Sequence, residues 1–314
     1  MKDFSTKYGK VRGVSTAYYY PTGEINECTV NKYCELKTNL GVLIPRYKED
    51  GIRSKNTKSI SFYKSGNIRS ISLNERTIVP TPIGEIKAEL ITFYENGNLK
   101  RLFPLNGKIT AYWTEKNEYE LAEELKFNFQ FGRLKNKVIC INFYDSGQVK
   151  SLTFWSKDTV TIDTPNGKMQ VRIGISTYED GKLKTCEPAS QVNVDTPIGS
   201  ITAYDINALG INGDKNSLNF YENGRVKSLY TSTDMIEVYN ESGCVAAFQP
   251  KLKPSIFNEN VMDIVPFNIE FYDGKVRFND SDEASFEINK YIFKISKGVT
   301  NITKETNNCT GCSK

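Results

Sequence analysis

The chain has 314 residues, enough for one to three domains of ordinary size and for a substantial buried core. Its 41 basic and 37 acidic residues give a net charge of +4, which is too small to make nucleic acid a default partner. The sequence contains no histidine, and this excludes Ser-His-Asp and Cys-His catalytic groups and every histidine-ligated metal or haem site.

The first residues of the chain carry no targeting signal that can be read from the sequence. Residues 1–7 lack the apolar run of a signal peptide, and no stretch approaches the roughly 18 consecutive apolar residues of a membrane-spanning helix. We therefore expect a cytoplasmic protein without a transmembrane segment. Its seven cysteines are then expected to be thiols rather than disulfides.

A short segment of the type aliphatic-x-x-Tyr-x-x-Gly, with Phe before the Tyr in most copies, recurs along the chain. Six copies have their Tyr and Gly at Tyr20 and Gly23, Tyr63 and Gly66, Tyr94 and Gly97, Tyr144 and Gly147, Tyr178 and Gly181, and Tyr221 and Gly224. A seventh copy, residues 269–274, is one residue shorter. Alternating β-branched and aromatic residues before a Gly-containing turn predict a β-hairpin at each copy. The return strands do not alternate strictly, which predicts β-bulges or burial on both faces.

A second signature lies between copies of the first. Thr81-Pro82-Ile83-Gly84 recurs as Thr196-Pro197-Ile198-Gly199, with weaker versions at 164–167 and 38–41, and with only the second half kept at 107–111 and 243–247. Pro and Gly at these places favour a tight turn. Gly23 to Gly41, Gly66 to Gly84 and Gly181 to Gly199 are each 18 residues apart, so the two signatures together predict one recurring pair of hairpins.

Two insertions interrupt the spacing of these signatures. Residues 112–138 include the only predicted helix, over 117–126, with Asn117 and Glu120 resembling a capping box and Tyr119, Ala122 and Leu125 on one face. Residues 204–217 contain two glycines and predict a loop. Residues 283–296 predict two final strands that cap the array, and residues 299–314 are a polar, flexible tail.

The pattern Phe-Tyr-x-x-Gly-x-aliphatic-Lys/Arg, as in Phe93-Tyr94-Glu95-Asn96-Gly97-Asn98-Leu99-Lys100, resembles the bacterial variant of the MORN repeat over roughly residues 15–280. The resemblance implies an elongated, tandem array of antiparallel β-hairpins in an all-β fold, here with one short helical insertion. It also implies an interaction module or an antitoxin component without catalytic groups. We expect a tandem hairpin domain over 1–250, a last hairpin and cap over 251–298, and the tail over 299–314.

Cations and tyrosines of the predicted hairpins are the first candidate binding residues. A basic residue follows six of the turns at the same place, namely Arg69, Lys100, Lys150, Lys184, Lys227 and Arg277. Such a ladder could bind an acidic partner. The alternative is that these cations pair within each hairpin with the acid that follows the Tyr, at Glu95, Asp145, Glu179, Glu222 or Asp273. The tyrosines are interpreted as a stacked structural row whose hydroxyls reach water.

Cysteines and irregularly placed acids are the remaining candidates for chemistry. Cys309 and Cys312 form a C-x-x-C that could hold a metal or act as a redox pair, whereas Cys28 and Cys186 are interpreted as small buried hydrophobic residues. Two carboxylates suffice for glycoside hydrolysis. The acids outside the regular pattern that could supply them are Asp205, Asp214, Glu123 and Glu124.

These observations favour a non-catalytic β-repeat scaffold that binds a protein partner and needs no cofactor. Two alternatives stay open at this point. One is a carboxylate-dependent, glycosidase-like enzyme with its site in the insertions at 112–138 and 204–217. The other is a basic ladder that binds an acidic membrane surface or a toxin.

Overall fold

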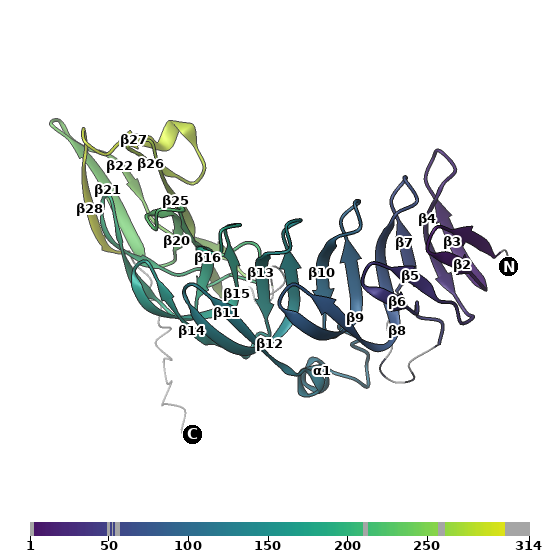
Figure 1. Ribbon diagram of the computed structural model, residues 1–314. Coiled ribbons are helices and arrows are strands. Elements are labelled where there is room, and N and C mark those ends of the chain that lie inside the picture. Colours follow the sequence, from purple (N-terminus) through teal and green to yellow (C-terminus); the bar gives the residue numbers. More distant parts are fainter. Residues whose placement is uncertain are drawn as a thin grey trace, which may run out of the picture. The chain divides into compact units, whose positions relative to one another are not determined.

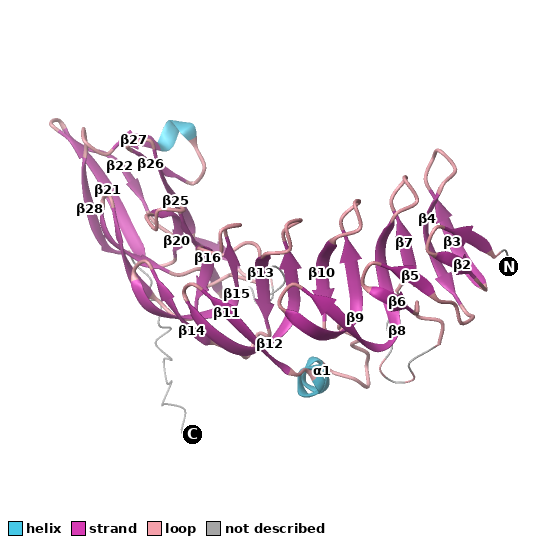
Figure 2. Cartoon of the chain, in the orientation of Figure 1, coloured by secondary structure: helices cyan, strands magenta, loops and turns pink. Residues whose placement is uncertain are grey.

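The computed structural model describes residues 3–48, 51, 53, 57–209, 213–256 and 261–298. The chain is nearly all β, with antiparallel sheets and one α-helix among the described residues, so the all-β prediction is confirmed (Figures 1 and 2). It divides into two compact units. Unit 1 contains Met1–Ser190 and Ala208–Arg225, and unit 2 contains Gln191–Asn207 and Val226–Lys314.

Unit 1 is built on one antiparallel sheet in which each strand pairs with the next strand of the sheet along the chain. In pairing order its strands are β3 (Val14–Tyr19), β4 (Ile25–Val30), β7 (Ile60–Phe62), β8 (Ile68–Thr81), β9 (Gly84–Phe93), β10 (Leu99–Phe103), β12 (Gly132–Phe143), β13 (Val149–Phe154), β15 (Gly167–Thr177), β16 (Leu183–Pro188) and β19 (Leu218–Phe220).

Shorter hairpins extend from this sheet. They are β1 (Phe4–Thr6) with β2 (Gly9–Val11), β5 (Leu36–Thr38) with β6 (Gly41–Leu43), β11 (Glu124–Phe129) with the first half of β12, and β14 (Val160–Thr164) with the first half of β15. The far ends of β8 and β9 pair in the same way, from Thr77 with Ala88 to Thr81 with Gly84.

The core of unit 1 follows one row of directly paired apolar residues that crosses the sheet. Every member of this apolar row is fully buried, and the row consists of Cys28, Ile60, Ile71, Ile91, Leu102, Ile141, Leu152, Ile175, Cys186 and Leu218. Because successive residues of a strand face opposite sides, the next residue of each strand points away from this core. No single hairpin could bury such a row alone, so pairing between hairpins supplies the hydrophobic stabilisation.

The turns that begin at the recurring tyrosines share one hydrogen-bond pattern. In the turn between β9 and β10, the Tyr94 N–H donates to Asn98 O (2.8 Å) and the Gly97 N–H donates to Tyr94 O (3.0 Å). Gly97 has φ +93°, which favours glycine over residues with a Cβ. The same two bonds close the turns that begin at Tyr20, Tyr63, Tyr144, Tyr178 and Tyr221. The pairing register shifts beside this turn, between Leu99 and Arg101, as the predicted bulge requires.

Five of the recurring tyrosine hydroxyls connect one hairpin to the next, a role that was not expected from the sequence. The Tyr94 hydroxyl donates to Phe143 O (2.8 Å), and the Tyr144 hydroxyl donates to Thr177 O (2.8 Å). Equivalent bonds run from Tyr20 to Phe62 O, from Tyr63 to Phe93 O and from Tyr178 to Phe220 O. The acceptor in each case is the residue that precedes the next tyrosine. A phenylalanine could pack similarly but would leave this carbonyl without its partner.

Threonine organises the second kind of turn. Thr81 Oγ1 donates to Gly84 O (2.6 Å) and accepts from the Ile83 N–H (3.3 Å), which fixes the two residues between the strands. The same pair of bonds forms at Thr6, Thr38, Thr164 and Thr196. The turn at Thr6, over residues 6–9, was not predicted from the sequence.

The predicted helix is present but begins earlier than expected. Helix α1 (Glu115–Leu121) has Thr114 as its N-cap, and Asn117 is the third helical residue of the capping box rather than the cap. Tyr119 and Ala122 pack with Leu105, Trp155 and Ile139, whereas Leu125 belongs to β11. Residues 124–138 thus lie in β11 and β12, so the segment between sheet strands that is not a hairpin is 104–123. The half signature at 107–111 forms no strand.

Unit 2 contains further antiparallel sheets. They are β17 (Val192–Thr196) with β18 (Gly199–Ala203); β20 (Val226–Thr231), β25 (Phe267–Tyr272), β26 (Lys275–Phe278) and β27 (Ser285–Glu287); β22 (Gly243–Phe248), β21 (Asp234–Asn240) and β28 (Ile292–Lys297); and β23 (Lys251–Pro254) with β24 (Met262–Val265). A 3-10 turn, η1 (Asp282–Ala284), precedes β27. The two strands predicted over 283–296 correspond to β27 and β28.

Candidate functional site

A row of polar residues crosses the face of the unit 1 sheet opposite the apolar row. Its members are paired directly from strand to strand and are Glu27, Ser61, Ser70, Thr92, Arg101, Asn142, Ser151, Ser176, Thr185 and Asn219. Each follows or precedes a member of the apolar row, so the alternation of the strands places the two rows on opposite faces. We call these ten residues the polar row.

The part of the polar row between β4 and β10 lies in an open groove of about 680 Å³. Glu27, Ser61, Ser70, Thr92 and Arg101 of the polar row line the groove, together with Thr57, Lys58, Tyr63, Arg69, Ser72, Leu90, Phe93 and Lys100. Four of these residues are cations and one is a carboxylate. Several others are hydroxyl residues that can donate or accept hydrogen bonds. The groove therefore offers hydrogen bonds and excess positive charge on the face of the sheet.

Two cations of the groove have neutral partners. Arg69 donates to Ser61 Oγ (3.3 Å) and to Asn26 Oδ1 (3.0 Å). Lys100 Nζ lies 5.2 Å from the centre of the Tyr94 ring. A cation held by a ring or an amide keeps its full charge available to an anion. By contrast, Lys58 is 3.4 Å from the Glu27 carboxylate and neutralises the one acid of the groove.

Two polar atoms at the β9–β10 end of the groove are buried without a partner. Thr92 Oγ1 and Arg101 Nε form no hydrogen bond with any described residue. Buried polar atoms are nearly always paired in folded proteins, because an unpaired one loses about 1–3 kcal/mol of hydration.

Beyond Arg101 the polar row is covered by the chain itself. Residues 213–217, which we call the strap, lie across β12, β13, β15 and β16. The Gly213 N–H donates to Thr153 Oγ1 (2.9 Å), Asn216 Nδ2 donates to Thr185 Oγ1 (2.6 Å), and the Ser217 N–H donates to Glu187 Oε2 (2.7 Å). Contact is close enough that a Cβ on Gly174 would lie 2.5 Å from the Gly213 Cα. Glycine is therefore required where the strap crosses the sheet.

Asp214 is the centre of the strap. Its carboxylate accepts hydrogen bonds from Arg101 NH2 (2.8 Å), Asn142 Nδ2 (3.3 Å) and the Ser151 hydroxyl. These three residues are neighbours in the polar row. An arginine, an amide and a hydroxyl thus hold one carboxylate on the open face of the sheet. Arg101 belongs both to this site and to the groove, so the strap begins where the groove ends.

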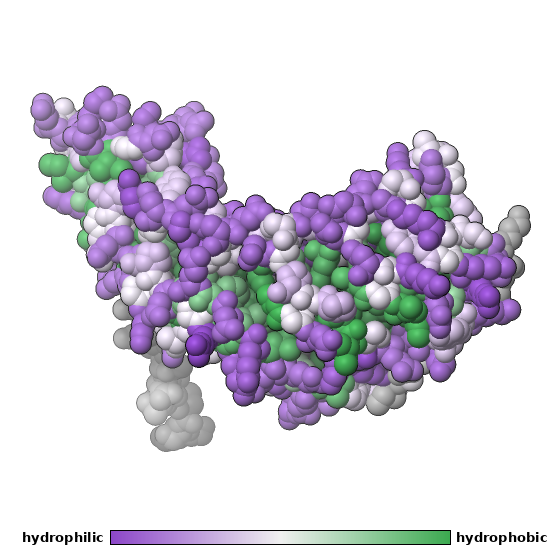
Figure 3. All heavy atoms as spheres, viewed as in Figure 1, coloured by the Kyte–Doolittle hydropathy of each residue, from purple (hydrophilic) through white to green (hydrophobic). Residues whose placement is uncertain are grey.

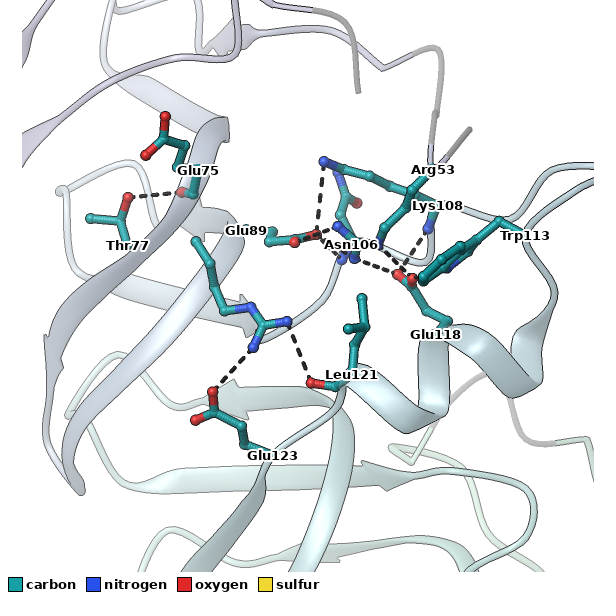
Figure 4. A network of polar contacts seen from close by, with 11 residues as sticks. Arg53, Glu75, Thr77, Glu89, Asn106, Lys108, Trp113, Glu118, Leu121 and Glu123 are labelled. Atoms are coloured by element: carbon teal, nitrogen blue, oxygen red, sulfur yellow. Dashed lines mark hydrogen bonds and ion pairs between the residues drawn. The ribbon is translucent and has the colours of Figure 1, made fainter. Parts of the chain in front are cut away.

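A second polar cluster anchors α1 to the sheet (Figure 4). Arg53 binds two buried carboxylates, Glu89 through NH1 (2.7 Å) and Glu118 through Nε (2.7 Å), with further bonds from NH2 to both. The Trp113 indole N–H (2.9 Å) and the Lys108 backbone N–H (3.1 Å) also donate to Glu118. Burial acts to raise the pKa of Glu118, but the donors from Arg53, Trp113 and Lys108 outweigh it and lower that pKa. The carboxylate is therefore ionised and fully bonded.

Of the sequence-predicted cations, the structure brings only Arg69 and Lys100 together in the groove. Lys150 and Lys184 lie on β13 and β16, each over the tyrosine ring of its own turn at 5.5 and 5.2 Å. Lys227 and Arg277 lie in unit 2, where Arg277 bonds to Glu270 and Asp282. Asp145, an expected partner of Lys150, instead accepts from Asn96 and Asn98 of the preceding turn.

Sequence reasoning missed Ser61, Ser70 and Thr92, although a polar residue stands two places before most of the recurring tyrosines.

The cysteines divide by position. Cys28 and Cys186 are fully buried, as predicted, and burial raises the pKa of both thiols, to about 12 for Cys28. Cys140 is also buried, and Cys244 is exposed. Cys309 and Cys312 lie outside the described residues.

The acids proposed for catalysis have cationic or polar partners where they are described. Asp214 is held by Arg101, Glu123 by Arg76 (3.2 Å) and Lys87 (3.1 Å), and Glu124 by Lys135 (2.6 Å). The hydrogen bond from Lys135 is the main cause that lowers the pKa of Glu124. A carboxylate with a lowered pKa is a poor general acid near neutral pH.

Comparison of the chain with protein-family models, with curated proteins and with solved structures finds no match. Within the described residues, no helix is long and apolar enough to cross a bilayer. The evidence for function therefore comes from the groove and the polar row. In the space-filling view, hydrophilic residues dominate the edge formed by the Tyr–Gly turns of unit 1 (Figure 3).

Proposed function

We propose that this protein is a non-catalytic β-scaffold, built as a tandem hairpin array similar to the bacterial MORN variant, that binds a protein partner in the groove of unit 1. The observation that carries the proposal is the groove itself, with about 680 Å³ of open space over a continuous row of hydroxyl and basic side chains. Two of its polar atoms are buried without a partner. Ligand sites combine such concave surfaces with a few polar groups in fixed positions.

The recurring tyrosines support a scaffold rather than an enzyme. Their hydroxyls are used to join successive hairpins, and their rings hold cations such as Lys100 and Lys150. Of the acids that would have supplied carboxylate chemistry, Asp214, Glu123 and Glu124 are paired with cations in unit 1. The groups that line the groove are hydrogen-bond donors, hydrogen-bond acceptors and cations, which suit a binding surface.

Position-dependent photo-crosslinking tests this proposal. A chain that carries benzoylphenylalanine at Ser70, in the groove, should form one protein adduct in an extract of the source cells, whereas the same group at Ser65, in the exposed turn, should not. The captured protein, once purified, should bind the wild-type chain. Filling the groove by Ser70→Trp should weaken this binding by about tenfold or more, whereas the matched Ser65→Trp variant should leave it unchanged. Equal binding by the two Trp variants, or an adduct from Ser65 alone, would contradict the proposal.

A further inference from the structure

The strap shows how unit 1 holds an extended segment on its polar face. The Asp214 carboxylate accepts hydrogen bonds from Arg101, Asn142 and Ser151. The Gly213 N–H donates to Thr153, and the Asn216 side chain donates to Thr185. The segment runs across the strands rather than along an edge. An acid on the bound segment meets an arginine and a hydroxyl on the sheet.

The groove presents the same kinds of side chain on the other side of Arg101. Ser61 and Ser70 pair across β7 and β8 as Asn142 and Ser151 pair across β12 and β13, and Thr92 follows on β9. Arg69 adds a guanidinium beside Ser61. A carboxylate in the groove would therefore find an arginine and hydroxyl donors, as Asp214 does on the strap side.

Charge favours an acidic occupant. Arg69 and Lys100 bond to neutral partners, whereas Lys58 already pairs with Glu27 and Arg101 with Asp214. A carboxylate on Arg69 would gain a charge-assisted hydrogen bond, the strong class of such bonds.

Resting on the proposed function, we propose that the groove binds an extended, acidic segment of a protein partner. The segment continues the line of the strap across β10, β9, β8, β7 and β4 and places a carboxylate on Arg69, because Arg101 already binds Asp214. With strands about 4.8 Å apart and an extended chain of about 3.3 Å per residue, this path of four strand spacings accommodates about six residues.

Fluorescence polarisation with a defined probe tests the chemistry. The probe is a fluorescein-labelled octapeptide in which Asp alternates with Ser, and the control peptide carries Asn in place of each Asp. The full-length protein should bind the Asp peptide about tenfold more tightly than the Asn peptide. Arg69→Gln should remove most of this difference, whereas the matched variant Lys150→Gln, outside the groove, should leave it unchanged. Asp214→Asn, which releases Arg101, should tighten binding of the Asp peptide.

Other outcomes would overturn the inference. Equal binding of the Asp and Asn peptides, or equal weakening by Arg69→Gln and Lys150→Gln, would show that the groove does not select carboxylates. Binding of phosphatidylglycerol vesicles, but not of the peptide, through Arg69 would replace a protein segment with a membrane surface. If Ser70→Trp still weakens binding of the crosslinked partner while the Asp peptide does not bind, the acidic occupant is wrong and the proposed function stands.

Discussion

At the scale of single residues, the recurring tyrosine has a role that only the folded sheet reveals. The turn glycines could be predicted, because a tight turn requires positive φ at that position, and Gly97 and its equivalents have it. The hydroxyl bonds could not, because their acceptors, such as Phe143 O for Tyr94, lie 49 residues away on another hairpin. A sequence shows which residue recurs but not which atom it contacts across a sheet.

Removing one of these hydroxyls should reduce stability measurably. Tyr94→Phe keeps the ring but leaves Phe143 O without its donor, and we expect a loss of about 1 kcal/mol in the free energy of unfolding. The urea midpoint of the purified protein measures the loss. Tyr112→Phe is the control, because Tyr112 is 83% exposed, and it should leave the midpoint unchanged. Equal midpoints for the two variants would show that the hydroxyl bond contributes nothing.

At the scale of elements, the sequence predicted hairpins that carry a recurring turn signature and missed others that do not, such as those that turn at 6–9 and at 130–131. The hairpin of β11 and β12 turns at 130–131 without threonine or proline, so 112–138 was interpreted as one insertion. A spacing signal was present, since Gly132 precedes Gly147 by 15 residues, close to the 13 between Gly84 and Gly97. The helix was placed three residues late because Asn117 fits a capping box as either its first or its last member.

The anchor of α1 predicts a dependence of stability on pH. The pKa of Glu118 is lowered in the folded state, so the stabilisation from its charge is complete above the pKa of an unfolded Glu, about 4.3, and is lost as the pH falls through the lower folded pKa. Glu118→Gln should lower the free energy of unfolding by about 3 kcal/mol at neutral pH, because it leaves Arg53 short of a charged partner.

Urea titrations at about pH 6 and about pH 3 measure both effects. The wild-type midpoint should fall more between these two values than the midpoint of Glu118→Gln. The exposed Glu120→Gln serves as the control and should follow the wild type. Parallel pH curves for wild type and Glu118→Gln would contradict the assigned role of this carboxylate.

At the scale of the whole molecule, the features that could not be predicted from the sequence are those formed by contacts between residues far apart in the chain. The interpretation of Asp214 as a residue of special chemistry came from its place in an irregular loop. Its partners Arg101, Asn142 and Ser151 are 63 to 113 residues away in sequence, so the strap and the groove that ends beside it became visible only in the folded unit. Local patterns specify strands and turns, whereas the binding face is created by their pairing.

Two variants test which part of the segment between β10 and β13 is an insertion and which part belongs to the sheet of unit 1. Replacing 107–121 by a short Gly-Ser linker removes α1 but retains β10, β11 and β12, so the β signal in circular dichroism should persist with a lowered urea midpoint. Deleting 112–138 removes β11 and the first half of β12 and should abolish cooperative unfolding of unit 1. Similar behaviour of the two variants would contradict the assignment of 124–138 to the sheet.

The two rows that cross the sheet also restrict how the length of this chain can change during evolution. Ile91 and Thr92 are neighbours on β9 but belong to the apolar and the polar row. Loss of one residue from the middle of β9 would exchange their faces, whereas loss of two would preserve the parity. Single-residue insertions and deletions should therefore be selected against within the strands and be tolerated better in exposed turns between them.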